Sequence, residues 1–235
     1  MLFLLIDLSA WFLQPWTEQG TPLSTLPIII LICLSAYIIF DQGIGLELLD
    51  KLRNAIAPMV LSVGRGLGKT GLPPNFWTFL GLLVSIVAGA IYAGYIEGGF
   101  ILAGLVLLLG GALDIVDGAV AKATNRITKS GAFLDSTVDR VSEVAVFAGI
   151  LMSNTVDGYL VILALAFSLL VSYTRARGES LGLTLGGVGI GERPERIIAL
   201  VIFSIAGLLY WGVVIVLILA LITFLQRVIF IVQRI

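Results

Sequence analysis

The stretch that decides the fold reads FILAGLVLLLGGALDIVDGAVAKAT over residues 100–124, and GAFLDSTVDRVSEVAVFAGILMS follows it over residues 131–153. Each stretch is long and apolar enough for a helix that spans the roughly 30 Å hydrocarbon core of a bilayer. The composition of the whole chain is also typical of a protein in a lipid bilayer. Of its 235 residues, 59% are hydrophobic and 12% are charged, and its mean hydropathy is +1.09. Both stretches nevertheless carry aspartates, which are rare inside membrane spans and mark functional sites there.

Apolar runs elsewhere in the chain extend this pattern to six spans. The predicted spans cover residues 76–96, 100–124, 131–153, 158–175, 197–210 and 212–226. The last two are short, and we predict that they form a tight helical hairpin with its turn at Trp211. The sequence therefore predicts an all-α polytopic membrane protein with a six-helix transmembrane core over residues 73–235.

Residues 46–72 precede this core and place apolar side chains at helical spacing between charged ones. This pattern favours an interfacial amphipathic helix, although an ordinary packing helix has the same spacing. Residues 1–45 form an N-terminal hydrophobic extension of unknown role. Lysines and arginines lie almost entirely on one side of the predicted spans, so the positive-inside rule puts the charged end, and the active site, at the cytoplasmic face of the cell membrane.

Composition excludes several kinds of chemistry. The chain has no histidine, so it has no Ser-His-Asp triad and no histidine-bound zinc or haem. Its single cysteine, Cys33, cannot form an intrachain disulfide. A formal net charge of −1 argues against nucleic acid as a partner.

The aspartates form two pairs on neighbouring helices. Asp114 and Asp117 are spaced i, i+3, while Asp135 and Asp139 are spaced i, i+4, so each pair shares one helix face. The short connection, residues 123–130, makes the helices antiparallel neighbours and brings all four carboxylates to a similar depth. Each carboxylate costs roughly 2.5–3.5 kcal/mol in a membrane helix, and Arg140 alone cannot neutralise four. Oxygen ligands favour Mg²⁺ or Mn²⁺, and four carboxylates suit two ions.

Small and basic residues lie beside these carboxylates. Gly118 and Ala121 leave room for a shallow groove in which a flat nucleotide can lie, although close helix packing also uses small residues. Arginines recur at three span ends on the charged side, where they either bind a dianionic phosphate or anchor the helices at the membrane surface. The candidate phosphate-binding residues are Arg175, Arg177, Arg193, Arg196 and Arg227.

The string D-x2-D-G-x2-A-K-x8-G-x3-D-x3-D, from Asp114 to Asp139, resembles the signature of the CDP-alcohol phosphotransferase family, which has arginine where this chain has Lys122. The resemblance implies that the chain replaces CMP on a CDP-linked lipid with an alcohol. It implies metal binding by all four aspartates and proton abstraction by Asp139. It further implies a CDP-lipid site, which comprises Asn75, Thr78, Asp117, Gly118, Ala121, Lys122 and Gly131. Members are expected to be homodimers.

Three further sequence stretches resemble the branch of this family that makes phosphatidylinositol phosphate or archaetidylinositol phosphate. They are residues 131–140, SYTRAR over residues 172–177 and ERPER over residues 192–196. The resemblance implies inositol phosphate as the acceptor, held by the candidate arginines. Glycerol 3-phosphate, another phosphorylated polyol, also suits an arginine pocket.

Two other functions use aspartates within membrane helices. An intramembrane prenyltransferase needs two acidic motifs on well-separated helix pairs, whereas both pairs here flank one short connection. A cation transporter can use an aspartate cluster as its ion site, but this function leaves the arginines and the small residues beside the cluster unexplained.

Overall fold

The computed structural model describes residues 58–95 and 99–235, and this part of the chain is entirely helical apart from turns and connections. The prediction of an all-α protein is therefore confirmed for the described residues. The predicted extension, residues 1–45, lies outside them, as does most of the predicted helix over residues 46–72. The elements, in chain order, are α4 (Pro74–Ala90), η3 (Ile91–Tyr95), α5 (Gly99–Ala123), α6 (Lys129–Met152), α7 (Gly158–Ser180), α8 (Arg193–Ile205) and α9 (Leu209–Val232).

Local chemistry sets the helix ends that matter for the site. Pro74 occupies the first turn of α4, where its missing N–H costs no hydrogen bond. Thr128 caps α6, because its side-chain oxygen accepts a hydrogen bond from the Gly131 N–H at 3.0 Å. These two ends lie near each other, since a Cβ atom on Gly131 would be 3.8 Å from Asn75 Oδ1.

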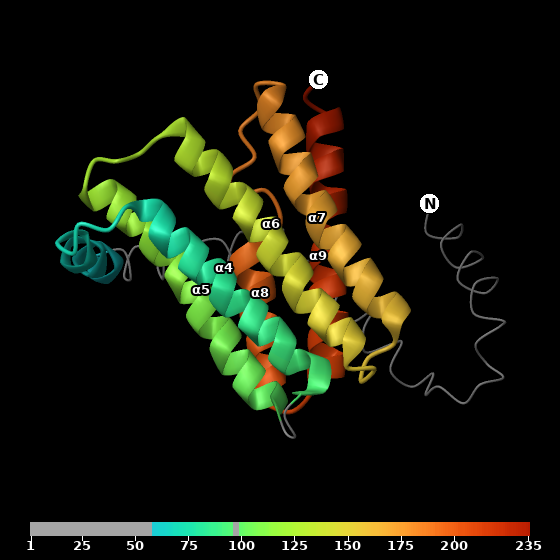
Figure 1. Ribbon diagram of the computed structural model, residues 1–235. Helices are drawn as coiled ribbons and strands as arrows, with labels where there is room; N and C mark the ends of the chain where they lie inside the picture. Colours follow the sequence, from blue (N-terminus) through green and yellow to red (C-terminus); the bar gives the residue numbers. More distant parts are fainter. Residues whose placement is uncertain (1–57, 96–98) are drawn as a thin grey trace, which may run out of the picture. The chain divides into compact units, whose positions relative to one another are not determined.

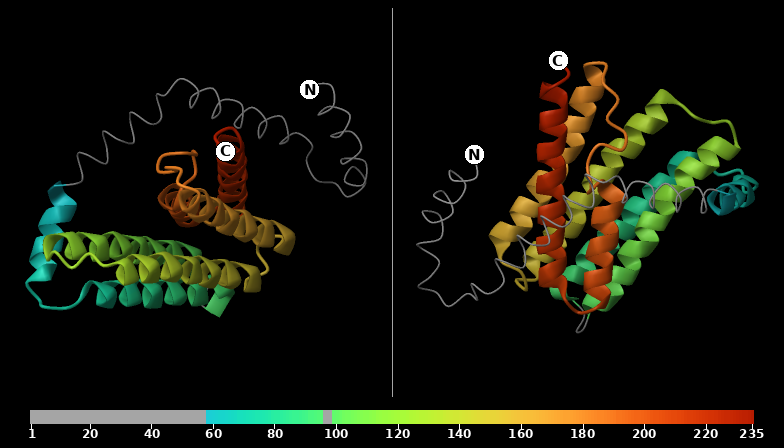
Figure 2. Two further views of the ribbon diagram at one scale, coloured as in Figure 1. Left: turned by 90° about the horizontal axis from the view of Figure 1, so that it is seen from above. Right: turned by 180° about the vertical axis from the view of Figure 1, so that it is seen from behind.

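The helices pack in two groups joined by α8. α4 packs against both α5 and α6, α7 packs mainly against α9, and α8 lies between α5 and α9 (Figures 1 and 2). The buried apolar core fills the end of this bundle that lies away from the predicted aspartate site, around Tyr92, Phe147 and Val213. There the Tyr92 hydroxyl lies 2.6 Å from Ser204 Oγ, which links the end of the first span to α8.

Within residues 58–95 and 99–235, four helical segments are long and apolar enough to cross a membrane. They are Pro74–Gly94, Gly99–Ala123, Gly158–Ser180 and Leu209–Val232. α6 has sufficient length, but it carries Asp135, Asp139, Arg140 and Glu143. α8 has only 13 residues, or roughly 20 Å of helix. The six-span core therefore stays a prediction.

The predicted turn at Trp211 is wrong. The chain turns at residues 206–208, and Trp211 lies inside α9. Gly207 has a positive φ of 72°, which is the left-handed conformation that commonly ends a helix. A glycine, rather than the amphipathic tryptophan, marks the turn.

Residues 58–68 are helical and lie against α5. A Cβ atom on Gly64 would be 2.7 Å from the Ala119 carbonyl group, so the two backbones lie very close. Met59 and Val63 are exposed. The interfacial location of this segment stays a prediction.

We expect Gly149→Ala to destabilise the fold, because α4 and α6 cross at Gly89 and Gly149 without room for a side chain. A Cβ atom on Gly149 would collide with the backbone of Gly89. Overpacking of this kind costs about 1–3 kcal/mol, so the thermal unfolding midpoint in detergent should fall clearly. The matched control is Gly66→Ala, where a Cβ atom meets nothing within 4 Å. Equal midpoints for both variants would contradict the close crossing.

Candidate functional site

Three of the four predicted aspartates converge between α5 and α6. Asp114, Asp135 and Asp139 each place one carboxylate oxygen within 4.8 Å of the other two. The convergence follows from the helix spacing and from the short connection over residues 124–128. All three side chains are partly buried, so their negative charges repel one another in a region of reduced solvation.

Asp117 lies apart from this group of three and is almost fully buried. Its Oδ2 atom accepts a hydrogen bond of 2.6 Å from Thr78 Oγ1 on α4. Asp117 is still close enough to Asp114 and Asp135 for electrostatic interaction. The Thr78–Asp117 hydrogen bond therefore orients one carboxylate beside the cluster of the other three.

Arginines partly balance the charge of the cluster. Arg193, the first residue of α8, places its Nη1 atom 2.6 Å from Asp114 Oδ2 and 2.7 Å from Asp139 Oδ1. Arg140 Nη1 lies 3.1 Å from Asp139 Oδ2. With Asp117 and Asp135, four negative charges face two positive ones, so the local charge remains negative.

A divalent cation fits this donor set. The three converging carboxylates supply only oxygen ligands, the type that Mg²⁺ and Mn²⁺ prefer. Asp139 Oδ1 is buried and accepts no hydrogen bond, although Arg193 approaches it, so it retains the capacity to bind an ion. A cation of charge +2 would neutralise the remaining negative charge of the four aspartates.

A pocket of about 180 Å³ opens beside the cluster, between the ends of α4, α5 and α6. All seven residues predicted for the CDP-lipid site line it: Asn75, Thr78, Asp117, Gly118, Ala121, Lys122 and Gly131. A Cβ atom on Gly118 would meet nothing within 4 Å, which favours the predicted groove over close helix packing at this position. Asp135 also lines the pocket, so the pocket adjoins the carboxylate cluster.

The sequence interpretation missed five residues that line this pocket, namely Pro74, Arg126, Ile127, Thr128 and Ala132. Arg126, Ile127 and Thr128 come from the connection between α5 and α6. The sequence could have predicted these three residues. A connection of only five residues that follows the predicted nucleotide groove has to stay close to that groove. Arg126 adds a positive charge beside Lys122, where the family signature has arginine.

The five candidate arginines do not form one open ring. Arg175 is 43% exposed, and it contacts Glu179 Oε1 at 3.0 Å and Glu192 Oε1 at 3.7 Å. Arg177 is also exposed, and its Nη1 atom donates to Ser180 Oγ at 3.4 Å. Arg193 faces the aspartate cluster. The side chains of these three arginines are therefore either exposed to solvent or directed at the aspartate cluster.

Arg196 and Arg227 are buried and bonded within the protein. Arg196 donates to Glu143 Oε1 at 2.7 Å and to the Gly191 carbonyl at 2.8 Å. Arg227 donates through three nitrogens, and its acceptors are the Val188 carbonyl, the Val171 carbonyl and Glu192 Oε1, at 2.7–2.9 Å. Their role as phosphate ligands stays a prediction.

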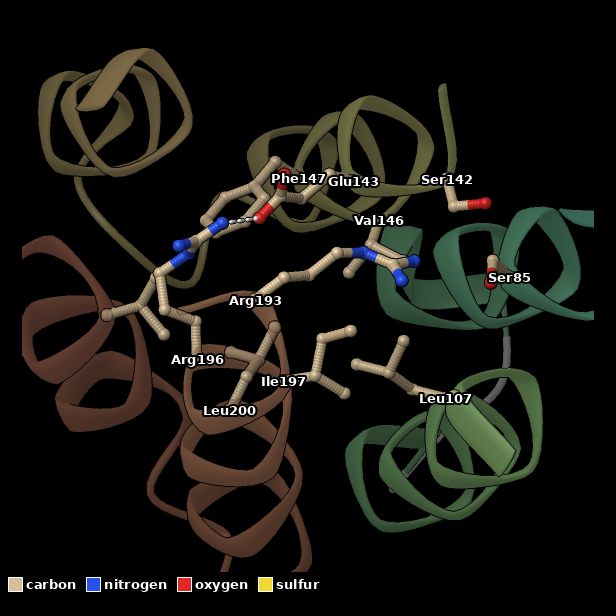
Figure 3. Close-up of a pocket in the computed structure, with 12 residues that line it drawn as sticks. Ser85, Leu107, Ser142, Glu143, Val146, Phe147, Arg193, Arg196, Ile197 and Leu200 are labelled. Carbon is tan, nitrogen blue, oxygen red and sulfur yellow. Dashed lines mark hydrogen bonds and ion pairs between the residues drawn. The ribbon is translucent and has the colours of Figure 1, made fainter. Parts of the chain in front are cut away.

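Glu143 is another polar residue that the sequence interpretation missed. It lies one turn after Asp139 on α6, just before the apolar residues 144–151, and this spacing was its signal. Figure 3 shows its ion pair with Arg196, which joins α6 to α8. The pocket in this view lies between α4, α5, α6 and α8, and Arg193 also lines it.

Comparisons with known proteins identify the family of the chain. The family model for CDP-alcohol phosphatidyltransferase matches residues 72–233. The chain is 40% identical over 181 residues to the archaetidylinositol phosphate synthase of Pyrococcus horikoshii, an alignment that covers 77% of this chain and 95% of the relative. It is 38% identical over 178 residues to the phosphatidylinositol phosphate synthase of Streptomyces avermitilis, covering 72% of each chain.

Solved structures extend the likeness to three dimensions. The phosphatidylinositol phosphate synthase of Mycobacterium tuberculosis with CDP-DAG bound has a TM-score of 0.65 and 28% identity, covering 74% of this chain and 94% of that one. The same enzyme in complex with manganese and citrate has the same TM-score and identity, covering 74% and 89%. The predicted family resemblance, and with it a phosphotransferase enzyme that lies in a membrane, is thereby confirmed. The chain belongs to the CDP-alcohol phosphatidyltransferase family.

Proposed function

We propose that this enzyme transfers the phosphatidyl or archaetidyl group of a CDP-linked lipid to a hydroxyl of inositol phosphate and releases CMP. The observation that carries the proposal is the pocket between α4, α5 and α6, which brings all seven predicted CDP-lipid residues together next to the aspartates. The names of the relatives support inositol phosphate as the acceptor, since archaetidylinositol phosphate and phosphatidylinositol phosphate synthases both appear among them.

The four aspartates would hold two ions of Mg²⁺ or Mn²⁺. Asp114, Asp135 and Asp139 offer converging oxygens, and Asp117 is oriented by Thr78 beside them. Bound dications would polarise the diphosphate and neutralise charge on the leaving CMP. Gly118 and Ala121 would leave space for the nucleotide, while Lys122 would contribute positive charge near its diphosphate.

Asp139 is proposed to accept the proton of the attacking hydroxyl. The hydroxyl oxygen forms a bond to the phosphorus that carries the lipid, and the bond from that phosphorus to the oxygen of CMP breaks. Ion pairs with Arg140 and Arg193 hold the Asp139 carboxylate in place beside the other aspartates. Because a carboxylate is a weak base, orientation and charge neutralisation supply most of the rate.

The acceptor phosphate is proposed to bind arginines from α7 and α8. Arg175, Arg177 and Arg193 are the candidates with solvent or the site beside them. Guanidinium groups bind phosphate through paired hydrogen bonds, which suits a dianionic ligand. A phosphorylated polyol uses such a pocket, and a neutral alcohol does not need one.

The domain organisation is also a proposal. We propose that residues 73–235 form a six-span domain, in which α6 and α8 accompany the four long apolar helices. Residues 46–72 would lie at the membrane interface, and the site would face the cytoplasm because basic residues gather at its end. Residues 1–45 are assigned as a hydrophobic extension, and the enzyme is expected to be a homodimer in the cell membrane.

The first experiment tests the reaction directly. Purified protein with Mn²⁺ and CDP-archaeol or CDP-diacylglycerol should release CMP when inositol phosphate is added. We expect at least about a hundredfold less CMP release from Asp139→Asn, because an amide cannot accept the proton. Faster release with glycerol 3-phosphate than with inositol phosphate would assign the other acceptor.

The control for this assay is Asp157→Asn, which changes an exposed aspartate next to α7, at the opposite end from the cluster. It should keep full turnover. CMP release without any added alcohol would contradict the proposed transfer, and full turnover by Asp139→Asn would remove Asp139 from the proton-accepting role.

Metal binding can be measured apart from turnover. Electron paramagnetic resonance titration of Mn²⁺ should give an affinity at least about tenfold weaker for Asp135→Asn than for the wild type, because one anionic ligand is lost. Asp157→Asn should bind Mn²⁺ normally. Competition by Mg²⁺ in the same titration would rank the two ions. An unchanged Mn²⁺ affinity in Asp135→Asn would contradict the assignment of this aspartate cluster as the metal site.

The acceptor site is tested by Arg175→Ala. Loss of a charged hydrogen bond should raise the KM for inositol phosphate by about tenfold and leave the KM for the CDP-lipid nearly unchanged. Arg234→Ala is the matched control, since Arg234 lies over the Phe230 ring, 3.7 Å from its centroid, near the end of the chain. If both KM values rise equally in Arg175→Ala, the arginine anchors the fold instead.

A further inference from the structure

The connection between α7 and α8 is held against α9 by side chains of α9. The Gly191 N–H donates to Thr223 Oγ1 at 2.8 Å, and the Ile190 N–H donates to Gln226 Oε1 at 3.3 Å. Arg227 donates from its Nε atom to the Val188 carbonyl at 2.8 Å. Three of the five backbone positions from residue 188 to residue 192 are therefore bonded to one face of α9, because residues 226 and 227 lie three and four positions after residue 223.

Two glycines make this close approach possible. Gly189 has a φ of 113°, which other residues rarely adopt, and a Cβ atom there would collide with the Thr223 side chain. A Cβ atom on Gly191 would lie 2.8–3.0 Å from Leu219, including its backbone. Earlier in the same connection, a Cβ atom on Gly186 meets nothing within 4 Å. The requirement for glycine is thus strict where the connection touches α9.

A residue that the proposed reaction needs, Arg193, follows directly after this segment. Glu192 pairs with Arg227 at 2.9 Å, and Arg193 begins α8 and contacts Asp114 and Asp139. A shift of the segment along α9 would therefore move the Arg193 side chain relative to the aspartates. Small displacements of this kind are costly for group transfer, which depends on the alignment of the two reactants.

We propose that Thr223, Gln226 and Arg227 form a clamp, here called the α9 clamp, that positions Arg193 for the acceptor phosphate. The inference rests on the proposed function and deepens it. Within the clamp, Arg227 is a positioning residue and not a phosphate ligand. Its three donating nitrogens already have protein acceptors, and its side chain is only 2% exposed. A phosphate could reach Arg227 only by displacing these hydrogen bonds.

Thr223 gives the sharpest test, because it is neutral, fully buried and unable to touch a substrate. Thr223→Val keeps the shape of the side chain and leaves the Gly191 N–H without its acceptor. We expect the KM for inositol phosphate to rise about threefold to tenfold. The KM for the CDP-lipid and the Mn²⁺ affinity should stay within twofold of the wild type. Thr223→Ser retains the hydroxyl and should restore the KM for inositol phosphate.

A glycine pair tests the same contact from the other side. Gly191→Ala pushes the segment away from Leu219 and should raise the KM for inositol phosphate by a similar factor. Gly186→Ala is its matched control and should behave like the wild type. Thermal unfolding midpoints, measured for every variant, separate a general loss of stability from a displaced acceptor site.

A double-mutant cycle decides the role of Arg227. If Arg227 acts through the segment that Thr223 holds, Thr223→Val combined with Arg227→Lys should raise the KM no more than about twofold above the larger single effect. Multiplied effects would show that Arg227 acts independently of the segment that Thr223 holds and would overturn its assignment to the clamp.

Two failures can be told apart in this experiment. If wild-type protein releases no CMP with inositol phosphate, the proposed function fails and the clamp falls with it. If the wild type is active but Thr223→Val lowers only the thermal midpoint, or raises both KM values equally, the clamp alone is overturned.

Discussion

The constraint on which the structure depends is the burial of negative charge. Three carboxylates converge in the site, those of Asp114, Asp135 and Asp139, and Asp117 lies beside them. The protein lies in a membrane, where charged side chains are poorly solvated. Arginines lower this cost only in part, so the site favours divalent cations. The same constraint explains why α8 begins where it does, since its first residue, Arg193, faces two of the carboxylates.

Buried ion pairs continue from the aspartates toward α9. Glu143 on α6 pairs with Arg196 on α8, and Glu192 pairs with Arg227 on α9. Buried pairs contribute little net stability, because desolvation offsets their attraction, but breaking one leaves an uncompensated charge. Their effect is therefore on arrangement: the Glu143–Arg196 pair joins α6 to α8, and the Glu192–Arg227 pair joins the residue before α8 to α9.

Local spacing made part of the site predictable from the sequence. The i, i+3 and i, i+4 spacing of the aspartates and the short connection after α5 were sufficient to predict their convergence. The pairs that involve Glu143 and Arg227 were not predictable, because their partners lie 53 and 35 positions away and depend on tertiary packing. An arginine that bonds carbonyls also looks, in sequence, the same as one that binds phosphate. The turn was misplaced at Trp211 because aromatic residues suit helices and interfaces equally, whereas Gly207 ends the helix through its backbone.

The two proposed substrate sites draw on different helices, and this division suits the reaction. α4, α5 and α6 line the pocket beside Asp117, whereas α7 and α8 carry Arg175 and Arg193. Asp139 lies where the two sets of helices meet, because it contacts Arg193 and belongs to the α6 face that carries Asp135. In phosphoryl transfer the attacking and leaving oxygens are roughly in line, so donor and acceptor must approach the phosphorus from different directions. Separate helix sets allow each substrate to be oriented independently. The contact between Arg193 and Asp139 then joins the two sites, because Arg193 is proposed to bind the phosphate of the acceptor and Asp139 to take the proton of its attacking hydroxyl.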